Sequence, residues 1–163
     1  MGEIGEVLIR TRALMKGYWN NPAASAEALR GSFMHTQDLG YLDDGGFLFI
    51  VDRMKDMIIS GGENIYSWEV EEALRHHPAV AEVAVIAVPD PTWGEAVKAC
   101  VVLHDGAGAT AHDLIEHCRA RIASYTKPRS VDFMDALPRL FNGKINKKAL
   151  RAQYWQGHER QVS

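Results

Sequence analysis

Two apolar runs of strand length constrain the fold more than any other feature of this sequence. Residues 80–88 form the first run, which Pro89 ends, and residues 97–103 form the second, after a linker that contains Pro91 and Gly94. Short apolar runs bounded by such turn residues are typical of buried β-strands. The sequence therefore predicts two buried strands that pair antiparallel.

Further strands and helices alternate around this pair. The predicted helices carry start signals, because Ser, Thr and Asn are good N-caps and acidic side chains favour the first turn. In chain order the predicted elements are a short strand at 57–59, a helix from Ser67 to about His77, the two buried strands, a helix from Thr110 to Ile122, a strand at 131–134 and a helix that Asn146 caps, through about Tyr154. This alternation predicts a compact α/β (α+β) domain over residues 53–163, in which helices flank a short mixed or antiparallel sheet.

The first 52 residues have a different pattern, rich in β-hairpins. Their predicted elements are strands at 6–11, 33–41 and 47–51 and a helix at 22–30, with an Asp44-Gly45-Gly46 turn between the last two strands. This stretch contains too few apolar residues to form a stable domain alone.

Composition limits the class of protein. Hydrophobic residues make up 47% and charged residues 24%, which is close to a globular average and excludes a disordered chain. No apolar run approaches the roughly 18 residues of a membrane span, and residues 1–4 lack the basic and apolar regions of a signal peptide. We therefore expect a cytoplasmic protein without a membrane span. Cys100 and Cys118 occur without a CxxC motif and are predicted to be reduced core thiols.

Residues 52–64, DRMKDMIISGGEN, combine a charged cluster with a paired glycine. The side chains of Arg53, Lys55 and Asp56 can meet a phosphate or a ribose. Gly61 and Gly62 let a backbone approach a ligand with no Cβ in the way. The stretch is thus a candidate for ligand binding at both ends.

Asp38 and Arg53 flank the predicted hairpin. A carboxylate there could accept hydrogen bonds from both hydroxyls of a ribose. The alternative is an exposed salt bridge, worth at most about 1 kcal/mol. The residues alone leave both interpretations open.

Between Arg119 and Arg151 the sequence has nine basic residues and two acidic ones. Such a segment can face an anionic partner or form a solvated basic face. Aromatic residues are not interleaved with the charges, so nucleic acid is not an expected partner. Gly143-Lys144 lacks the upstream glycine and the Ser or Thr of a Walker loop. Lys144 is either a point charge for a phosphate or an ordinary surface lysine.

A metal site is not predicted. His112, Glu116 and His117 resemble an inverted zinc-protease motif, but the spacing is one residue too long and places the two histidines on diverging faces of a helix. His76 and His77 are interpreted as a helix end, where histidine is favourable.

Seven short motifs occur in an order that resembles one known family. They are GEIGEVLIR at 2–10, MKGYW at 15–19, HTQD at 35–38, DRMKD at 52–56, SGGENI at 60–65, LPR at 137–139 and NGKI at 142–145. This series resembles the C-terminal end of the adenylate-forming (AMP-binding) acyl-CoA synthetase family, from residue 2 to about Tyr154. The resemblance implies that residues 1–52 end a large N-terminal AMP-binding domain and that residues 53–163 are the C-terminal domain.

The family's reaction converts a carboxylic acid and ATP to an acyl-adenylate, from which coenzyme A displaces AMP. The resemblance implies that Asp38 binds the AMP ribose with Arg53 beside it, and that Lys144 is catalytic at the α-phosphate. It implies that the small domain rotates about a hinge at Lys55 between the two steps. The site residues implied for coenzyme A are Gly61 and Gly62, which line the pantetheine passage, and Trp93, which packs against that arm.

The implied ligands are ATP or AMP and coenzyme A, with a fatty or aryl carboxylic acid as substrate. Magnesium and the acid are implied to bind the missing N-terminal domain, which is the expected partner, so the chain alone is expected to be inactive. A stand-alone binding module of the same fold and a peptide-synthetase adenylation domain are the alternatives. Exposed strand edges in residues 1–52 also predict either a homo-oligomer or a poorly ordered N-terminal region. The family commonly has Gly where Gln37 stands and Thr where Leu140 stands.

Overall fold

The computed structural model describes residues 2–157, and the chain divides into two units, Met1–Lys55 and Asp56–Ser163. The sequence-based boundary after residue 52 assigns Arg53 to the second domain, whereas in the structure Arg53 ends the last strand of the first unit. Both units combine helices with antiparallel strands, and the second also has a parallel pair. The predicted α+β fold class is therefore confirmed. Among the described residues, no helix is both long and apolar enough to cross a membrane.

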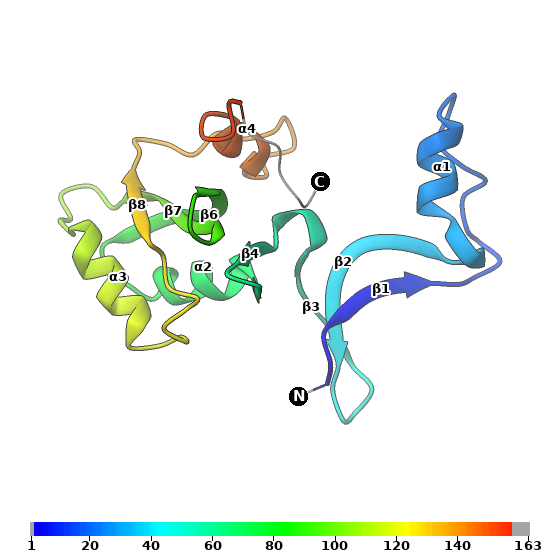
Figure 1. The fold of residues 1–163 in the computed structure, drawn as a ribbon, viewed down its shortest axis with the longest axis horizontal. Helices are drawn as coiled ribbons and strands as arrows, with labels where there is room; N and C mark the ends of the chain where they lie inside the picture. The colour runs from blue at the N-terminus through cyan, green and yellow to red at the C-terminus, as the bar shows by residue number, and fades with distance from the viewer. Residues whose placement is uncertain (1, 158–163) are drawn as a thin grey trace. The chain divides into compact units, whose positions relative to one another are not determined.

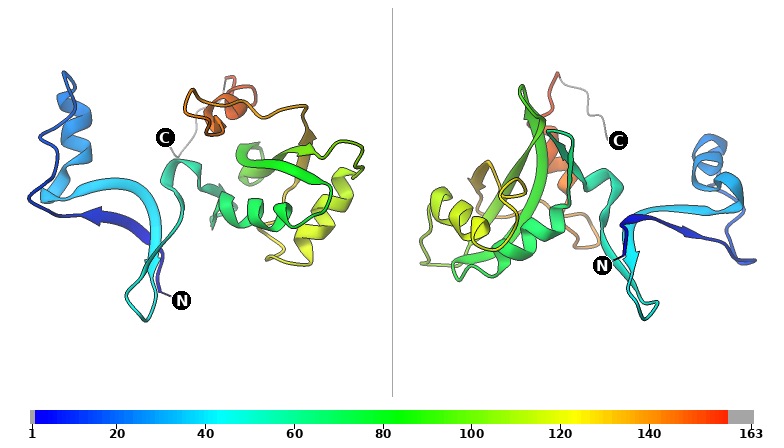
Figure 2. Two further views of the ribbon diagram at one scale, coloured as in Figure 1. Left: turned by 180° about the vertical axis from the view of Figure 1, so that it is seen from behind. Right: turned by 60° about the horizontal axis from the view of Figure 1, so that its bottom comes forward.

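The first unit is a three-stranded antiparallel sheet with one helix. Its strands, in the order β1-β2-β3, are β1 (Gly5–Ile9), β2 (Met34–Leu42) and β3 (Leu48–Arg53). In the turn between β2 and β3, the backbone N–H of Phe47 donates to Asp43 Oδ1 at 2.8 Å, and Gly46 has a φ of 78°. The predicted hairpin is confirmed. Figure 2 shows the curved β1–β2 ribbon with helix α1 (Pro22–Ala28) near one end.

Helix α1 starts as the sequence predicts and ends earlier. Asn21 Oδ1 accepts the N–H of Ala24 at 3.0 Å, and Pro22 occupies the first turn. The sequence predicts that the helix reaches Arg30, but α1 ends at Ala28 because Leu29 leaves the helical region, with a φ of −115° and a ψ of 34°. A 3₁₀ turn, η1 (Arg30–Ser32), follows, and in it Gly31 adopts a left-handed φ of 60°. A left-handed residue cannot continue a right-handed helix.

Many large apolar side chains of the first unit are exposed. Trp19 is 92% exposed and Phe47 70%, and three consecutive residues of β3 are about half exposed. The exposed members are Leu8, Ile9, Tyr18, Trp19, Leu42, Phe47, Leu48, Phe49 and Ile50. Exposed apolar side chains in this number are typical of a surface that packs against another protein segment.

The second unit is built on the predicted antiparallel pair. Strands β6 (Val80–Asp90) and β7 (Gly94–Leu103) pair along their length, from Val80↔Leu103 to Asp90↔Gly94. The remaining elements are β4 (Ile58–Ser60), β5 (Glu63–Ile65), α2 (Ser67–Arg75), α3 (Ala111–Arg119), β8 (Ser130–Phe133) and α4 (Lys147–Ala152). The sheet order is β5-β4-β7-β6, and β8 runs parallel to β7, so the sheet is mixed.

Both faces of the β6–β7 pair are buried. Along β6, Val83, Val85 and Ala87 pack in one cluster, whereas Ala84 and Ile86 pack in a second cluster on the other face. The first cluster includes side chains of α2 and α3, and the second includes Leu150 of α4. Figure 1 shows α2 and α3 on one side of the pair and α4 on the other. Because both faces are buried, successive residues along each strand are apolar, which explains the continuous apolar runs in the sequence.

Helix starts in the second unit follow the predictions with one exception. Thr110 and Asp113 form the predicted capping box of α3, and Asn146 Oδ1 accepts the N–H of Ala149 at the start of α4. The prediction that Ser67 caps α2 is wrong. Tyr66 occupies the N-cap position and makes no side-chain capping hydrogen bond, and the buried Ser67 hydroxyl instead accepts a hydrogen bond from Lys147 Nζ at 2.7 Å.

The two cysteines are buried and unpaired, as predicted. Burial raises the pKa of each thiol to about 11. At pH 8 a thiol with a pKa of about 11 is only about one part in a thousand thiolate, the reactive form. We expect native protein to release almost no chromophore from an aromatic disulfide reagent at pH 8, and two equivalents after addition of guanidinium. Fast labelling of either cysteine in the native state would contradict this prediction.

Candidate functional site

Asp38 and Arg53 lie opposite each other on β2 and β3. Arg53 Nε donates to Asp38 Oδ1 at 3.1 Å, with 56% and 32% of the two side chains exposed. The structure thus contains the exposed salt bridge that the sequence left as one interpretation. The same pair presents a carboxylate acceptor next to a guanidinium donor, which is the combination that a ribose phosphate requires.

The backbone before Asp38 is held in an unusual conformation. Gln37 has a φ of 60°, in the left-handed region that favours glycine. Its N–H donates to Glu6 Oε1 at 3.1 Å, and the Thr36 hydroxyl accepts the N–H of Asp38 at 3.1 Å. Burial raises the pKa of Glu6, but hydrogen bonds from His35 and the Gln37 N–H outweigh it and lower that pKa. The left-handed backbone at position 37 therefore favours glycine, and the hydrogen bond from the Gln37 N–H to Glu6 offsets part of the strain of a glutamine there.

Gly61 and Gly62 form the tight turn between β4 and β5, with φ values of 61° and 86°. The N–H of Gly61 donates to the carbonyl oxygen of Trp93 at 2.9 Å. A Cβ at Gly61 would lie 2.6 Å from Trp93 Cε3, whereas nothing lies within 4 Å of a Cβ at Gly62. The structure therefore brings Gly61 and Trp93, which are far apart in the sequence, into direct contact.

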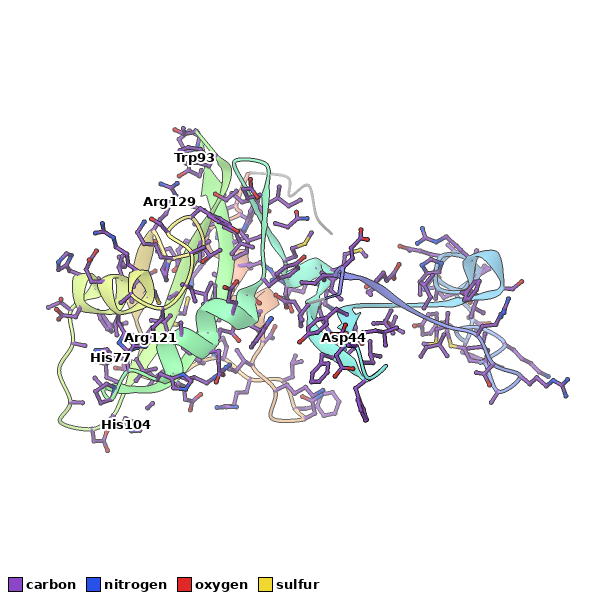
Figure 3. The ribbon with its side chains drawn as sticks, turned by 90° about the horizontal axis from the view of Figure 1, so that it is seen from below. Asp44, His77, Trp93, His104, Arg121 and Arg129 are labelled. Atoms are coloured by element: carbon purple, nitrogen blue, oxygen red, sulfur yellow. The ribbon has the colours of Figure 1, made fainter. Side chains whose placement is uncertain are left out.

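Trp93 is fixed from two further directions. Asp90 Oδ1 accepts its N–H at 2.9 Å, and the Arg129 guanidinium lies over its ring with Cζ 4.9 Å from the centroid. Hydrogen bonds from the N–H groups of Trp93 and Thr92 lower the pKa of Asp90, so this acceptor is ionised at neutral pH. Figure 3 shows Trp93 and Arg129 close together at one end of the unit, with His77 and His104 at the other. The sequence pointed to Arg129 only as one charge in a basic segment, so its contact with Trp93 was missed.

Lys144 lies at the end of a hydrogen-bonded loop. The loop closes through an isolated bridge between Arg139 and Ile145, and the N–H of Gly143 donates to the carbonyl of Leu140. Asn142 Oδ1 accepts the Lys144 N–H at 3.1 Å. Leu140 also donates its backbone N–H to the Lys144 carbonyl at 2.8 Å, so the loop is held by backbone bonds that any residue at position 140 can make.

Arg139 anchors this loop to the sheet. Its Nη1 donates to the Gly143 carbonyl at 2.7 Å and its Nη2 donates to Glu82 Oε2 at 2.5 Å. Glu82 lies on β6. The loop therefore has a fixed position relative to the sheet of its own unit.

The basic segment is mostly paired within the unit. Seven of its nine cationic side chains contact a described acidic group, a carbonyl oxygen or an aromatic ring: Arg119, Arg121, Lys127, Arg129, Arg139, Lys147 and Arg151. Lys144 and Lys148 are exposed and form no ion pair with another residue in the range 2–157. The segment thus chiefly holds the fold together, and Lys144 is one of two cations left for an external anion.

Lys55 lies within a 3₁₀ turn, η2 (Met54–Asp56), where the first unit ends. Asp56, the first residue of the second unit, accepts a hydrogen bond from Arg151 Nη1 at 2.6 Å.

Two histidines of the second unit, His117 and His77, are engaged in local contacts. His117 Nε2 lies 3.0 Å from the Ala73 carbonyl oxygen, and the His117 ring meets that of His77 edge to face. Burial and the nearby Arg121 lower the pKa of His117. Within residues 2–157 no three His, Cys, Asp or Glu side chains are arranged to hold a metal ion.

The predicted site residues therefore form three groups: Asp38 with Arg53, Gly61 and Gly62 with Trp93, and Lys144 on its own loop. Known proteins share the sequence and fold that carry these groups. The family model for the AMP-binding enzyme C-terminal domain matches residues 69–144. A feruloyl-CoA synthase of an Amycolatopsis species is 48% identical over 94% of the chain and 31% of its own length. The long-chain-fatty-acid–CoA ligase FadD13 of Mycobacterium tuberculosis is 46% identical over 92% of the chain and 30% of its own length.

The fold agrees with these matches. The crystal structure of ATP-bound MatB from Rhodopseudomonas palustris has a TM-score of 0.89 and 35% identity, covering 97% of this chain and 32% of that one. The chain spans about a third of the length of the relatives it matches. The resemblance drawn from the seven motifs is confirmed. The chain therefore belongs to the adenylate-forming acyl-CoA synthetase family, in which it corresponds to the AMP-binding enzyme C-terminal domain and the segment that precedes it.

Proposed function

We propose that the chain is the C-terminal part of an ATP-dependent acyl-CoA ligase. The reaction joins a carboxylic acid to coenzyme A through an acyl-adenylate and yields AMP and pyrophosphate. The observation that carries this proposal is the state of Lys144: its loop is anchored, and seven of the nine basic side chains in its segment are paired, while its own side chain is exposed and forms no ion pair with a described acidic group. A fixed cation in this state can stabilise the charge that develops at the α-phosphate during adenylation.

In the adenylation step, we assign the AMP ribose to Asp38. Its carboxylate can accept hydrogen bonds from the ribose hydroxyls, and Arg53 orients it through the 3.1 Å contact. Lys144 supplies the positive charge. Magnesium and the acyl group would be held outside this chain, in the N-terminal AMP-binding domain.

In the coenzyme A step, we assign the pantetheine arm to the surface formed by Gly61, Gly62 and Trp93. Nothing lies within 4 Å of a Cβ at Gly62, which leaves room for a chain to pass, and Trp93, packed against Gly61, supplies an apolar wall that is 45% exposed. A rotation at Lys55 would move Lys144 out of the active site and bring Gly61, Gly62 and Trp93 into it. Domain motions that complete a catalytic site in this way are common in enzymes.

The expected partner is an N-terminal AMP-binding domain. The exposed apolar side chains of the first unit, such as Trp19 and Phe47, support this assignment because a covering domain would bury them. The alternative is that two copies of this unit pair and bury these side chains in a homo-oligomer. The acid is an aryl or fatty acid, a range that the names of the feruloyl-CoA and fatty-acid ligases support.

A chimaera tests the function. The chain replaces the matching C-terminal part of the Amycolatopsis feruloyl-CoA synthase, and the products are followed by chromatography. We expect AMP and the coenzyme A thioester from the chimaera, and strongly reduced formation of both from the truncated synthase alone. A folded chimaera that is as inactive as the truncated synthase contradicts the proposal. Sub-micromolar binding of AMP or coenzyme A to the isolated chain would instead favour a stand-alone binding module.

A further inference from the structure

Helix α4, which follows the Lys144 loop, depends on tertiary contacts. It has six residues, Lys147–Ala152, and so short a helix is not stable by itself. Leu150 is its one fully buried apolar anchor, at 1% exposure. The position of α4, and of the loop that leads into it, must therefore be set by the side chains that tie it to the rest of the unit.

One of these ties joins the helix to the start of the unit. Arg151 Nη1 lies 2.6 Å from Asp56 Oδ1, and only 13% and 16% of the two side chains are exposed. A pair this well shielded is screened by solvent much less than a surface salt bridge, and loss of one partner leaves a charge unpaired in a largely buried place. Asp56 is also the residue at which the second unit begins.

A second tie joins α4 to α2. Lys147 Nζ lies 2.7 Å from Glu71 Oε1 and 2.7 Å from the Ser67 hydroxyl oxygen. Glu71 Oε1 also accepts a hydrogen bond from the N–H of Val85. Val85 lies on β6, which is an edge strand of the sheet, so this N–H can bond outside the sheet. This tie fixes one end of the helix, whereas Arg151 fixes the other to the beginning of the unit.

We propose that Arg151 is a positioning residue for Lys144. Its ion pair with Asp56 fixes helix α4, which follows the Lys144 loop, to the first residue after the junction at Lys55. A rotation at the junction would then move Lys144 together with Asp56 as one rigid part. This inference rests on the proposed function. Misplacement of a catalytic group by about 1 Å can cost about a hundredfold in rate, and the ties through Lys147 and Arg139 limit the displacement. We therefore expect about a tenfold effect on the step that uses Lys144.

The test uses the chimaera and measures its half-reactions separately. Adenylation is followed by exchange of pyrophosphate into ATP, and thioester formation by adding coenzyme A to preformed acyl-adenylate. Arg151→Gln and Asp56→Asn should each lower adenylation about tenfold and leave thioester formation unchanged. Arg151→Lys, which keeps the charge, should retain most of the rate. Lys148→Gln, which removes one exposed charge from the same helix, is the matched control and should retain all of it.

The decisive comparison is made in a Lys144→Ala background. If Arg151 acts through Lys144, Arg151→Gln has no further effect on adenylation there. A second tenfold loss in that background would overturn the proposal, as would equal losses in both half-reactions or an Arg151→Gln protein that no longer folds. These outcomes are separate from the proposed function, which fails instead if Lys144→Ala leaves adenylation intact.

Amide hydrogen exchange provides a readout that does not depend on turnover. In Arg151→Gln the amides of Leu140, Gly143 and Asn146, whose bonds close the Lys144 loop, should exchange faster. Exchange along β6 and β7 should be unchanged. Unchanged protection of the loop would also overturn the proposal.

Discussion

Replacing Lys144 with alanine should lower the adenylation rate of the chimaera by about 10²–10³-fold, the range found when one fixed donor to a developing charge is removed. The physical reason lies in the state of the side chain. Three basic residues near it in the sequence form ion pairs: Lys147 with Glu71, Arg139 with Glu82 and Arg151 with Asp56. Lys144 is exposed on an anchored loop, so that its charge can act on an external anion. Pyrophosphate exchange measures the loss.

The loss should be confined to one half-reaction. Thioester formation from preformed acyl-adenylate should keep its rate in Lys144→Ala, because the proposed rotation carries Lys144 away for that step. The control is Lys148→Ala, since Lys148 is also exposed and also without an ion pair among residues 2–157. A similar loss in both lysine variants would show a general effect of charge and contradict the assigned role.

The local parts of the fold were predictable from the sequence. The β6–β7 pair, the capping box at Thr110 and the cap at Asn146 each depend on residues that are close in the chain or on an apolar run. Strand β5 was not predicted, because Glu63 and Asn64 are polar and only Ile65 reaches the core. Its pairing with β4 comes from the tight glycine turn, which the sequence had indicated only as a ligand contact.

The long-range contacts of charged side chains were not predictable. Asp56 and Arg151 are 95 positions apart, and Ser67 and Lys147 are 80 apart. No periodicity or motif spacing relates residues across such distances, so Ser67 was expected to cap a helix and Arg151 was identified only as one of the nine charges of the basic segment. The candidate site residues came from short motifs, whereas the groups that hold them, including Arg129 and Arg139, required the fold.

Substituting Gly61 with alanine should impair the coenzyme A step by about a hundredfold, because two penalties act together. A left-handed alanine is strained by about 1–2 kcal/mol. In addition, its Cβ would lie 2.6 Å from Trp93 Cε3, so the indole must move from the place where Asp90 and Arg129 hold it. The rate of thioester formation at subsaturating coenzyme A measures the effect, and pyrophosphate exchange should be almost unchanged.

Gly62 separates the two penalties. Its φ of 86° is left-handed as well, but a Cβ there meets nothing within 4 Å, so Gly62→Ala carries strain without the collision. We expect Gly62→Ala to lose about as much stability to strain as Gly61→Ala does, about 1–2 kcal/mol, with a much smaller loss of rate. In a Trp93→Ala background the collision is gone, and the two alanine variants should have similar rates. If Gly61→Ala remained far slower than Gly62→Ala without the indole, displacement of Trp93 would not be the cause, and Gly61 would have to contact coenzyme A directly.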